Sequence, residues 1–218
     1  MEAYLGISTD KLLTAGAETI YMVCISLFIG AIIAFPLAIL LYLTRKNGMY
    51  QNRFVNGLLN IIINVIRSTP FIIMLVCVMP LTKVLVGTRI GTKAALVPLT
   101  IYIAPYLARL VEGALLETKA GIIEAAEAMG ATPLQIVWHF ILPESLGSLI
   151  LTITTGTIGL IGATAMAGYI GGGGIGNIAL TYGYQQFNNR LMFFTVLILI
   201  IVAQLIQNLG TWASAKIR

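Results

Sequence analysis

The chain has 218 residues, of which 58% are hydrophobic and only 10% are charged, and its mean hydropathy is +0.94. Because a soluble domain carries about 25% charged residues, this composition excludes an ordinary soluble protein and predicts an integral membrane protein surrounded by lipid. The net charge of +5 does not indicate a nucleic-acid partner, since no basic cluster stands beside stacking aromatic residues.

The apolar runs predict five membrane spans, since one span takes about 20 residues. The first span follows an amphipathic lead-in, residues 1–16, which lacks the basic start of a cleavable signal peptide. Five crossings place the two termini on opposite sides of the membrane, and residues 1–218 then form a single transmembrane domain. The predicted spans lie within residues 17–43, 55–86, 94–110, 146–170 and 191–209.

The second span contains a charged residue and a predicted break. Pro70 pushes Thr69 away from helical geometry and lacks a backbone donor itself, so we expect a kink or break there. Arg67 would cost roughly 3 kcal/mol if it faced lipid. It either reaches an interface, because the true span starts later, or faces a cavity or a partner, and the sequence leaves both alternatives open.

The third and fourth spans carry signs of bending and of close packing. Pro98 and Pro105 can bend the third span, and Arg109 and Glu112 share one helical face that we expect to end it at an aqueous surface. Glycines in the fourth span predict close helix–helix seams. They are Gly156, Gly159, Gly162 and Gly168. The residues that follow, 171–190, predict a flexible glycine-rich loop.

The residues that usually build metal or cofactor sites are scarce in this chain. His139 is the only histidine, and Cys24 and Cys77 lie in apolar runs, where we expect buried, unpaired thiols. Residues 171–176 match G-x-G-x-x-G, but no strand precedes them, so a nucleotide site is not expected. We therefore expect no catalytic residue, no metal and no cofactor.

Basic residues favour one orientation in the membrane by a small margin. On one side lie Arg45, Lys46, Arg53, Lys119, Lys216 and Arg218, and on the other Lys11, Lys83, Arg89, Lys93 and Arg190. The positive-inside rule therefore predicts an external N-terminus and a cytoplasmic C-terminus. The segment between the third and fourth spans is then cytoplasmic.

That segment, residues 121–144, is the longest connection that still carries a folding pattern. Two short helices are expected to meet at Gly130, which suits a left-handed C′ position. Thr132 is a good N-cap, Pro133 a good first helical residue, and Pro143 is expected to end the second helix. The expected apolar stripes are Ile122, Ile123, Ala126 and Met129 on the first helix, and Leu134, Val137 and Ile141 on the second.

Such an elbow can dock in a groove of a soluble partner, or its helices can lie flat on the membrane surface. The residues alone leave both readings open. Ala125 and Ala126 are small enough to let the first helix seat deeply, and Glu124 and Glu127 suit the positive end of its dipole. No nucleophile or metal ligand accompanies the two carboxylates, so acid–base catalysis is not expected.

The run EAAEAMGATPLQIVWHFILPE resembles the EAA loop of the binding-protein-dependent ABC importer permeases. The matching residues are Glu124, Ala125, Ala126, Gly130, Ile141, Leu142 and Pro143. Residues 62–75, 103–117 and 171–184 further resemble the methionine-uptake members of that superfamily. The resemblance therefore covers nearly the whole chain.

This resemblance implies an all-α membrane protein with the five-span type I importer fold, in which residues 121–144 are the coupling loop. It implies a bacterial plasma-membrane permease that is not an enzyme itself and that imports methionine or a related amino acid by alternating access. Its implied partners are a second copy of the chain, two ATP-binding cassette subunits that bind the ATP, an extracytoplasmic substrate-binding protein and the lipid bilayer.

Two groups of site residues are expected from this resemblance and from location. The residues expected to couple to the ATPase are Glu124, Ala125, Ala126, Glu127, Met129, Gly130, Thr132 and Pro133. The residues expected on the substrate path are Arg67, Thr164, Met166 and Tyr169, with residues 169–186 near the docked binding protein.

Two other classes of protein remain as alternatives: an ion-coupled carrier or channel that no ATPase drives, and a structural membrane scaffold. A carrier favours ionisable residues buried in its spans. Arg67 is the one candidate, and no acidic residue is expected in mid-span. Co-purification of an ATPase subunit would separate the importer from both alternatives.

Overall fold

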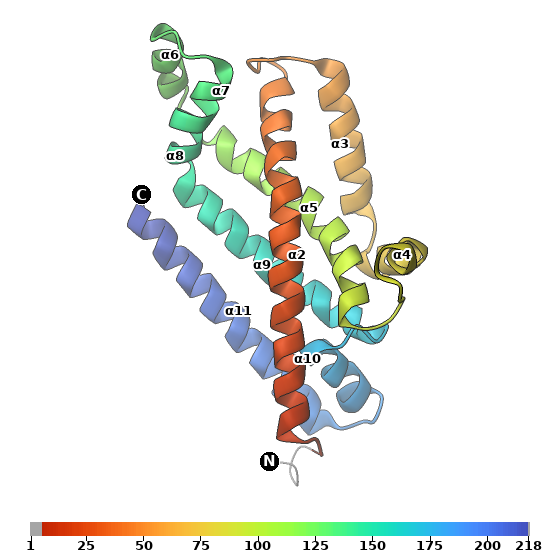
Figure 1. Ribbon diagram of the computed structural model, residues 1–218. Helices are drawn as coiled ribbons and strands as arrows, with labels where there is room; N and C mark the ends of the chain where they lie inside the picture. Colours follow the sequence, from red (N-terminus) through yellow and green to blue (C-terminus); the bar gives the residue numbers. More distant parts are fainter. Residues whose placement is uncertain (1–5, 218) are drawn as a thin grey trace.

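The computed structural model describes residues 6–217, and the regular elements in that range are all helices (Figure 1). Four helices are long and apolar enough to cross a membrane: α2 (Thr9–Thr44), α5 (Thr92–Leu116), α9 (Leu146–Tyr169) and α11 (Asn189–Ile217). The pair α3 (Arg53–Ser68) and α4 (Phe71–Val86) is bent by 108° and can count as a fifth span. The short elements are α6 (Ala120–Ala128), α7 (Pro133–Ile136), the π-helix η1 (Val137–Ile141), α8 (Leu142–Glu144), α10 (Gly174–Asn177) and the π-helix η2 (Ile178–Tyr184). The all-helical, multi-span prediction is confirmed.

The first helix is longer than the sequence indicated. α2 begins at Thr9, where the Ser8 side chain accepts the Lys11 N–H, so residues 9–16 belong to the helix and are not a separate lead-in. Pro36 lies inside α2 without ending it. A helix of 36 residues is about 54 Å long, which exceeds the hydrocarbon core of a bilayer. Residues 1–5 of the predicted lead-in, and Arg218, lie outside the described part.

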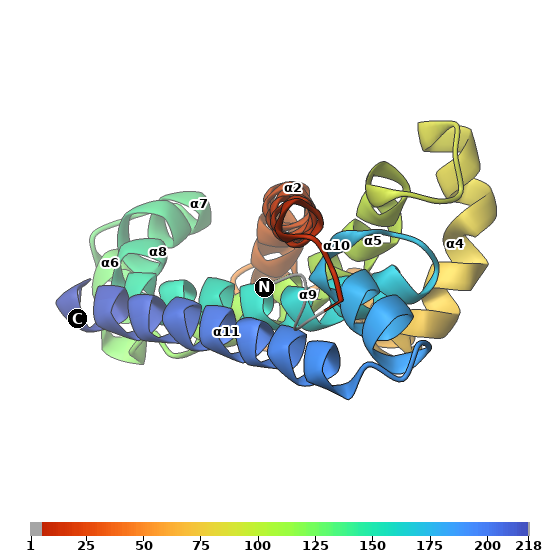
Figure 2. The ribbon, with the colours of Figure 1, turned by 90° about the horizontal axis from the view of Figure 1, so that it is seen from below.

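The second span breaks where Thr69 and Pro70 predicted. α3 starts behind Asn52, whose side chain accepts the N–H groups of Phe54 and Val55 at 3.1 Å. Thr69 takes an extended conformation (φ −79°, ψ 122°) before Pro70, and α4 then starts in a new direction. Seen from below, α4 reaches out from the other helices at one side of the molecule (Figure 2).

The core lies where α5 packs between α2 and α9. Leu99, Ile103 and Leu107 of α5 are fully buried there. Small residues allow this close approach, because a Cβ on Gly156 would lie 2.5 Å from Leu107 Cδ2. A Cβ on Gly168 would likewise lie 2.8 Å from the Asn177 Cα, whereas Gly162 faces open space. The predicted close seams therefore hold for Gly156 and Gly168, while Gly162 leaves the surface of α9 open.

A second close approach joins α9 to α11 and gives a stability prediction. Gly210→Ala would bring a Cβ within 2.8 Å of the Thr154 Cβ and into overlap with its hydroxyl, and overpacking of this kind costs about 1–3 kcal/mol. We expect a lower Tm in lipid nanodiscs, measured by intrinsic fluorescence. Gly16→Ala is the matched control, since its Cβ would meet nothing within 4 Å and alanine favours a helix. Equal Tm values for the two variants would contradict the tight crossing.

Both cysteines depart from the expected burial. Cys24 and Cys77 are free thiols, and each is exposed on the surface of the single chain. Lipid is as apolar as a protein interior, so an apolar run in a membrane protein need not turn its side chains inward. The prediction of buried cysteines was therefore wrong.

The predicted loop after the fourth span is largely ordered. α10 and η2 form one continuous helical segment over residues 174–184, so only the turn of residues 170–173 and the stretch 185–188 lie outside helices. The glycine turn itself has left-handed backbone at Gly171 and Gly173, with φ values of +79° and +80°. The prediction of a loop was therefore wrong for residues 174–184, where acceptors from α2 allow a helix to begin.

Candidate coupling site

The predicted turn at Gly130 is present with its full hydrogen-bond pattern. Gly130 has φ +77°, and its N–H donates to the Glu127 carbonyl at 2.9 Å. The next N–H, of Ala131, donates to the Ala126 carbonyl at 3.1 Å. These two bonds make the Schellman arrangement that closes a helix C-terminus. The end of α6 is therefore closed by backbone hydrogen bonds within the elbow.

The second arm of the elbow starts at a capping box. Thr132 Oγ1 accepts the Gln135 N–H, and Gln135 Oε1 accepts the Thr132 N–H at 2.8 Å, with Pro133 in the first turn. The start at Thr132 and Pro133 was predicted. The contribution of Gln135 was missed, although the spacing of Thr and Gln is a recognised signal in sequence.

Pro143 does not end the second arm as predicted. The chain runs from α7 through η1 into α8 and meets α9 at Ser145. In η1 each N–H bonds a carbonyl five residues back instead of the four of an α-helix, so that the Leu142 N–H donates to the Val137 carbonyl. Pro143 then sits in the first turn of α8, where a missing N–H costs little. The second arm is therefore continuous with the α9 span and can pass a displacement directly to it.

The elbow is anchored by a small apolar cluster at the ends of α2 and α5. Ala126, Ile136, Val137 and Ile141 are fully buried in it, beside Leu115. Each arm thus contributes to one shared contact with the membrane-spanning part. Met129 and Leu134 of the two stripes lie outside this cluster and are 68% and 54% exposed.

The opposite face of the elbow is open and carries most of the residues expected to couple to the ATPase. Ala126 is the exception, since it is buried and packs α6 against the ends of α2 and α5. The exposed members are Glu124, Ala125, Glu127, Met129, Gly130 and Thr132, while Pro133 is half-buried. Helices that lie on membranes carry Lys and Arg on their polar face. An open face with two carboxylates and an exposed methionine does not fit that pattern and suits a protein partner better.

The two carboxylates also border a hollow beside the connection from α2 to α3. This hollow of about 280 Å³ is lined by Glu124, Glu127, Arg45 and Met49 among others. Arg45 lies over the Tyr42 ring at 4.2 Å. Figure 1 places the elbow and this connection at one end of the molecule and the first turn of α2 at the other, while α11 ends beside the start of α9.

The pair of Arg109 and Glu112 forms before the end of α5, with Glu112 buried and Arg109 partly exposed. Arg109 Nη1 lies 2.7 Å from Glu112 Oε2, and Nη2 donates to Asn60 Oδ1 of α3. Glu112 is only 7% exposed, and α5 continues beyond it to Leu116. The pair therefore does not end the helix as expected, and Asn60 on α3 gives the guanidinium a second partner.

The four residues expected on the substrate path are not equally placed. Arg67 is exposed in the last turn of α3, close enough to Tyr102 of α5 for the two side chains to interact electrostatically. Met166 and Tyr169 are 49% and 60% exposed on α9. Thr164 is buried and donates to the Ile161 carbonyl at 2.7 Å, so its side chain is not open to a path in this conformation.

Known proteins resemble this chain over nearly its whole length. The model of the family described as "Binding-protein-dependent transport system inner membrane component" matches residues 26–218. The "Probable D-methionine transport system permease protein MetI" of Vibrio cholerae is 44% identical over 207 residues, covering 95% of this chain and 92% of that protein. The "Methionine import system permease protein MetP" of Bacillus subtilis is 43% identical and covers 94% and 92%. A solved chain from inward facing conformations of the MetNI methionine ABC transporter matches with TM-score 0.93 and 43% identity over 97% of this chain and all of that one.

The helical bundle with its capped elbow defines a multi-pass membrane permease subunit. The chain belongs to the family of binding-protein-dependent transport system inner membrane components, and it is the permease subunit of an ATP-driven importer.

Proposed function

We propose that this permease carries methionine across a bacterial plasma membrane, as a pair of identical chains with two ATP-binding cassette subunits and an extracytoplasmic binding protein. The names of the relatives in Vibrio cholerae and Bacillus subtilis support methionine as cargo. The solved MetNI transporter supports the ATPase partner and the permease pair. The observation that carries the proposal is the elbow, whose open face has no partner within the described part of this chain.

The elbow suits the transmission of force because each arm is held rigidly. The Schellman turn and the capping box fix the angle between α6 and α7, and the buried cluster beneath fixes their position. Ser148 Oγ also donates to Glu117 Oε2, which joins the two ends of the segment. Closure of two ATPase subunits around ATP would draw the two elbows together. Since the second arm runs into α9, the displacement reaches that span directly.

An open stripe along α9 supports a path for the cargo. Its exposed residues recur at helical spacing and are Thr155, Gly162, Met166 and Tyr169. At the elbow end the stripe meets a hollow of about 340 Å³ between α5 and α9, whose polar lining includes Arg109, Glu117 and Thr152. Tyr102 and Tyr106 of α5 stack with ring centroids 6.0 Å apart. Aromatic rings attract a thioether, so this stripe suits methionine. Thr164 is left out of the proposed path because it is buried.

The orientation we propose has the N-terminus outside and the C-terminus in the cytoplasm. An ATPase needs cytoplasmic ATP, so the elbow must face the cytoplasm if it couples to one. The last turn of α11 lies on the elbow side, where Ser214 bonds Gly147 at the start of α9, and α2 begins at the opposite end of the molecule (Figure 1). The small excess of basic residues at the elbow end agrees with this orientation.

The test is uptake by proteoliposomes that contain the permease with its ATPase subunit and binding protein. We expect uptake of labelled methionine only with ATP inside, with the L and D forms compared, and no uptake of histidine as a control cargo. Uptake without ATP that an ionophore abolishes would support the ion-coupled carrier instead. A permease that does not purify with an ATPase subunit would overturn the proposal.

A further inference from the structure

The outer end of the bundle, away from the elbow, holds a clamp made by two neighbouring side chains of α2. The Gly174 N–H donates to Glu18 Oε2 at 2.7 Å, and the Ile175 N–H donates to Thr19 Oγ1 at 2.9 Å. Glu18 and Thr19, termed here the outer clamp, therefore hold the start of α10 against α2. The two bonded segments are 156 residues apart in the sequence.

The clamp supplies hydrogen-bond acceptors for the first N–H groups of α10. The first N–H groups of a helix have no acceptor inside that helix, and α10 with η2 starts at Gly174. A carboxylate suits the positive end of a helix, and a charged acceptor makes a stronger hydrogen bond than a neutral one. Thr19 donates in turn to the Ala15 carbonyl at 3.0 Å, which fixes its hydroxyl oxygen as an acceptor. The order of residues 174–184 thus depends on α2.

The glycine turn is shaped to meet the clamp. Gly173 and Gly174 have φ values of +80° and +82°. A Cβ on Gly173 would lie 2.5 Å from Glu18 Oε2, and one on Gly174 would lie 2.8 Å from Thr19 Oγ1. Glycine is therefore required both by the backbone angles and by the close approach. Since glycine also adopts other angles at little cost, the turn can rearrange once the clamp is released.

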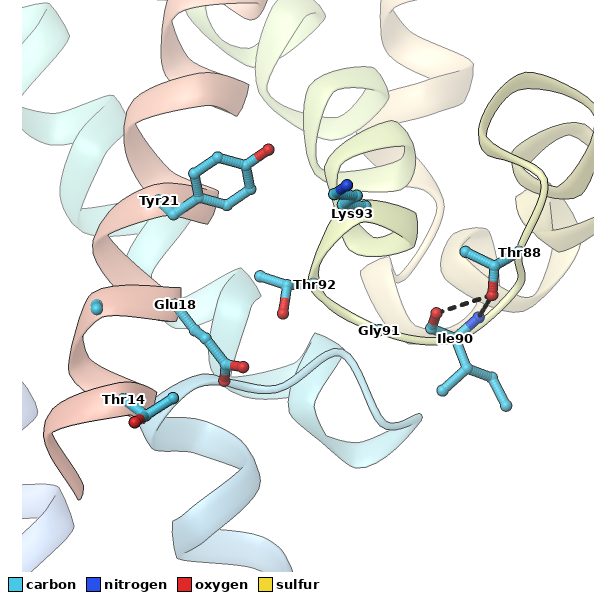
Figure 3. Close-up of a pocket in the computed structure, with 9 residues that line it drawn as sticks. Thr14, Glu18, Tyr21, Thr88, Ile90, Gly91, Thr92 and Lys93 are labelled. Atoms are coloured by element: carbon cyan, nitrogen blue, oxygen red, sulfur yellow. Dashed lines mark hydrogen bonds between the residues drawn. The ribbon is translucent and has the colours of Figure 1, made fainter. Parts of the chain in front are cut away.

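The clamp opens on one side onto a cavity, which lies at the aqueous outer end of the bundle in the proposed orientation. Glu18 borders an open cavity of about 520 Å³, together with Tyr21, Thr92 and Lys93 (Figure 3). In that view the Glu18 carboxylate points across the cavity wall toward the glycine turn. Its bond to Gly174 can therefore be replaced by water without leaving a bare charge in lipid, whose cost would otherwise keep the bond permanent.

We propose that Glu18 is a positioning residue for transport. It holds the turn between α9 and α10 against α2, so that the outer end of the bundle stays closed, and it releases this turn when ATP closes the ATPase subunits. The inference rests on the proposed function, since it needs a transport cycle. The structure that contains the clamp matches a transporter solved in inward facing conformations. In such conformations the outer end of the bundle is closed. Glu18 acts through the turn and does not touch the cargo.

The test is hydrogen–deuterium exchange of the complete permease–ATPase complex, at rest and trapped with ATP and vanadate. In the wild type we expect the peptide of residues 171–178 to exchange at least about tenfold faster in the trapped state. Glu18→Ala should exchange fast already at rest and hydrolyse several-fold more ATP per molecule transported. Glu18→Gln, which keeps an acceptor oxygen, should stay within about twofold of the wild type in both measurements.

Asp10→Ala is the matched control, because Asp10 is an exposed carboxylate on the same helix and should behave as wild type. If Glu18→Ala fails to assemble, Thr19→Val removes the other half of the clamp and should shift both measurements in the same direction. Two outcomes would overturn the inference, because each would show that the clamp only stabilises the fold. One is an unchanged exchange rate in the trapped wild type, and the other is an equal fall of transport and ATP hydrolysis in Glu18→Ala. Residues 120–136 report separately on the proposed function, since they must gain protection when the ATPase subunit binds.

Discussion

Glu112→Ala is expected to destabilise the permease by about 2–3 kcal/mol. Removing one partner of a buried ion pair typically costs 3–5 kcal/mol, roughly, because the other charge is left uncompensated. Arg109 is 27% exposed and keeps its bond to Asn60, so we expect a value at or below the lower end of that range. The measurement is the denaturation midpoint of the purified permease in nanodiscs, followed by loss of the folded fraction.

Two further variants separate the ion pair from a general loss of charge. Glu117→Ala removes another carboxylate of α5's C-terminal end, but Glu117 is exposed and bonds only Ser148 in the bonds described here, so the cost should stay under about 1 kcal/mol. Arg109→Leu combined with Glu112→Leu should recover most of the loss, since an apolar pair can replace a buried ion pair. A double variant as unstable as Glu112→Ala would contradict this account of the pair.

The sequence predicted those features that short-range backbone chemistry determines. Pro70 broke the second span, Gly130 made the left-handed turn, and Thr132 began the next helix. Each of these depends on the dihedral limits or hydrogen bonds of neighbouring residues. The long helices followed from apolar runs, which lipid requires of any span.

The errors arose where a distant partner decides the outcome. Glu112 is buried because α3 brings Asn60 to its arginine, and the helix after Gly173 starts because α2 brings Glu18. Neither partner can be assigned from spacing along the chain. Pro143 stays inside a helix because η1 shifts the hydrogen bonds before it, which a proline rule applied residue by residue does not anticipate.

Replacing Gly130 by valine is expected to reduce transport by about tenfold or more while the chain stays folded. A residue with a β-carbon in the left-handed region costs about 1–2 kcal/mol, and a β-branched one costs more. About 1.4 kcal/mol already changes a population tenfold. A Cβ at this position meets nothing within 4 Å in the chain itself, so the effect expected within the permease is backbone strain. The measurement is ATP-driven uptake in proteoliposomes, with the Tm recorded alongside.

Two substitutions make the Gly130 result specific to the angle of the elbow. Gly130→Asn adds a side chain of about the same size as valine, yet asparagine tolerates left-handed backbone. Transport by this variant should therefore stay within about twofold of the wild type. Gly121→Val places valine in α6 of the same elbow, where φ is ordinary and the Cβ also meets nothing, and it should leave coupling largely intact. If asparagine at 130 impairs transport as much as valine does, side-chain bulk at the ATPase contact is responsible instead of the turn. If valine at 130 is harmless, the capped turn does not set the geometry by which the two arms move α9.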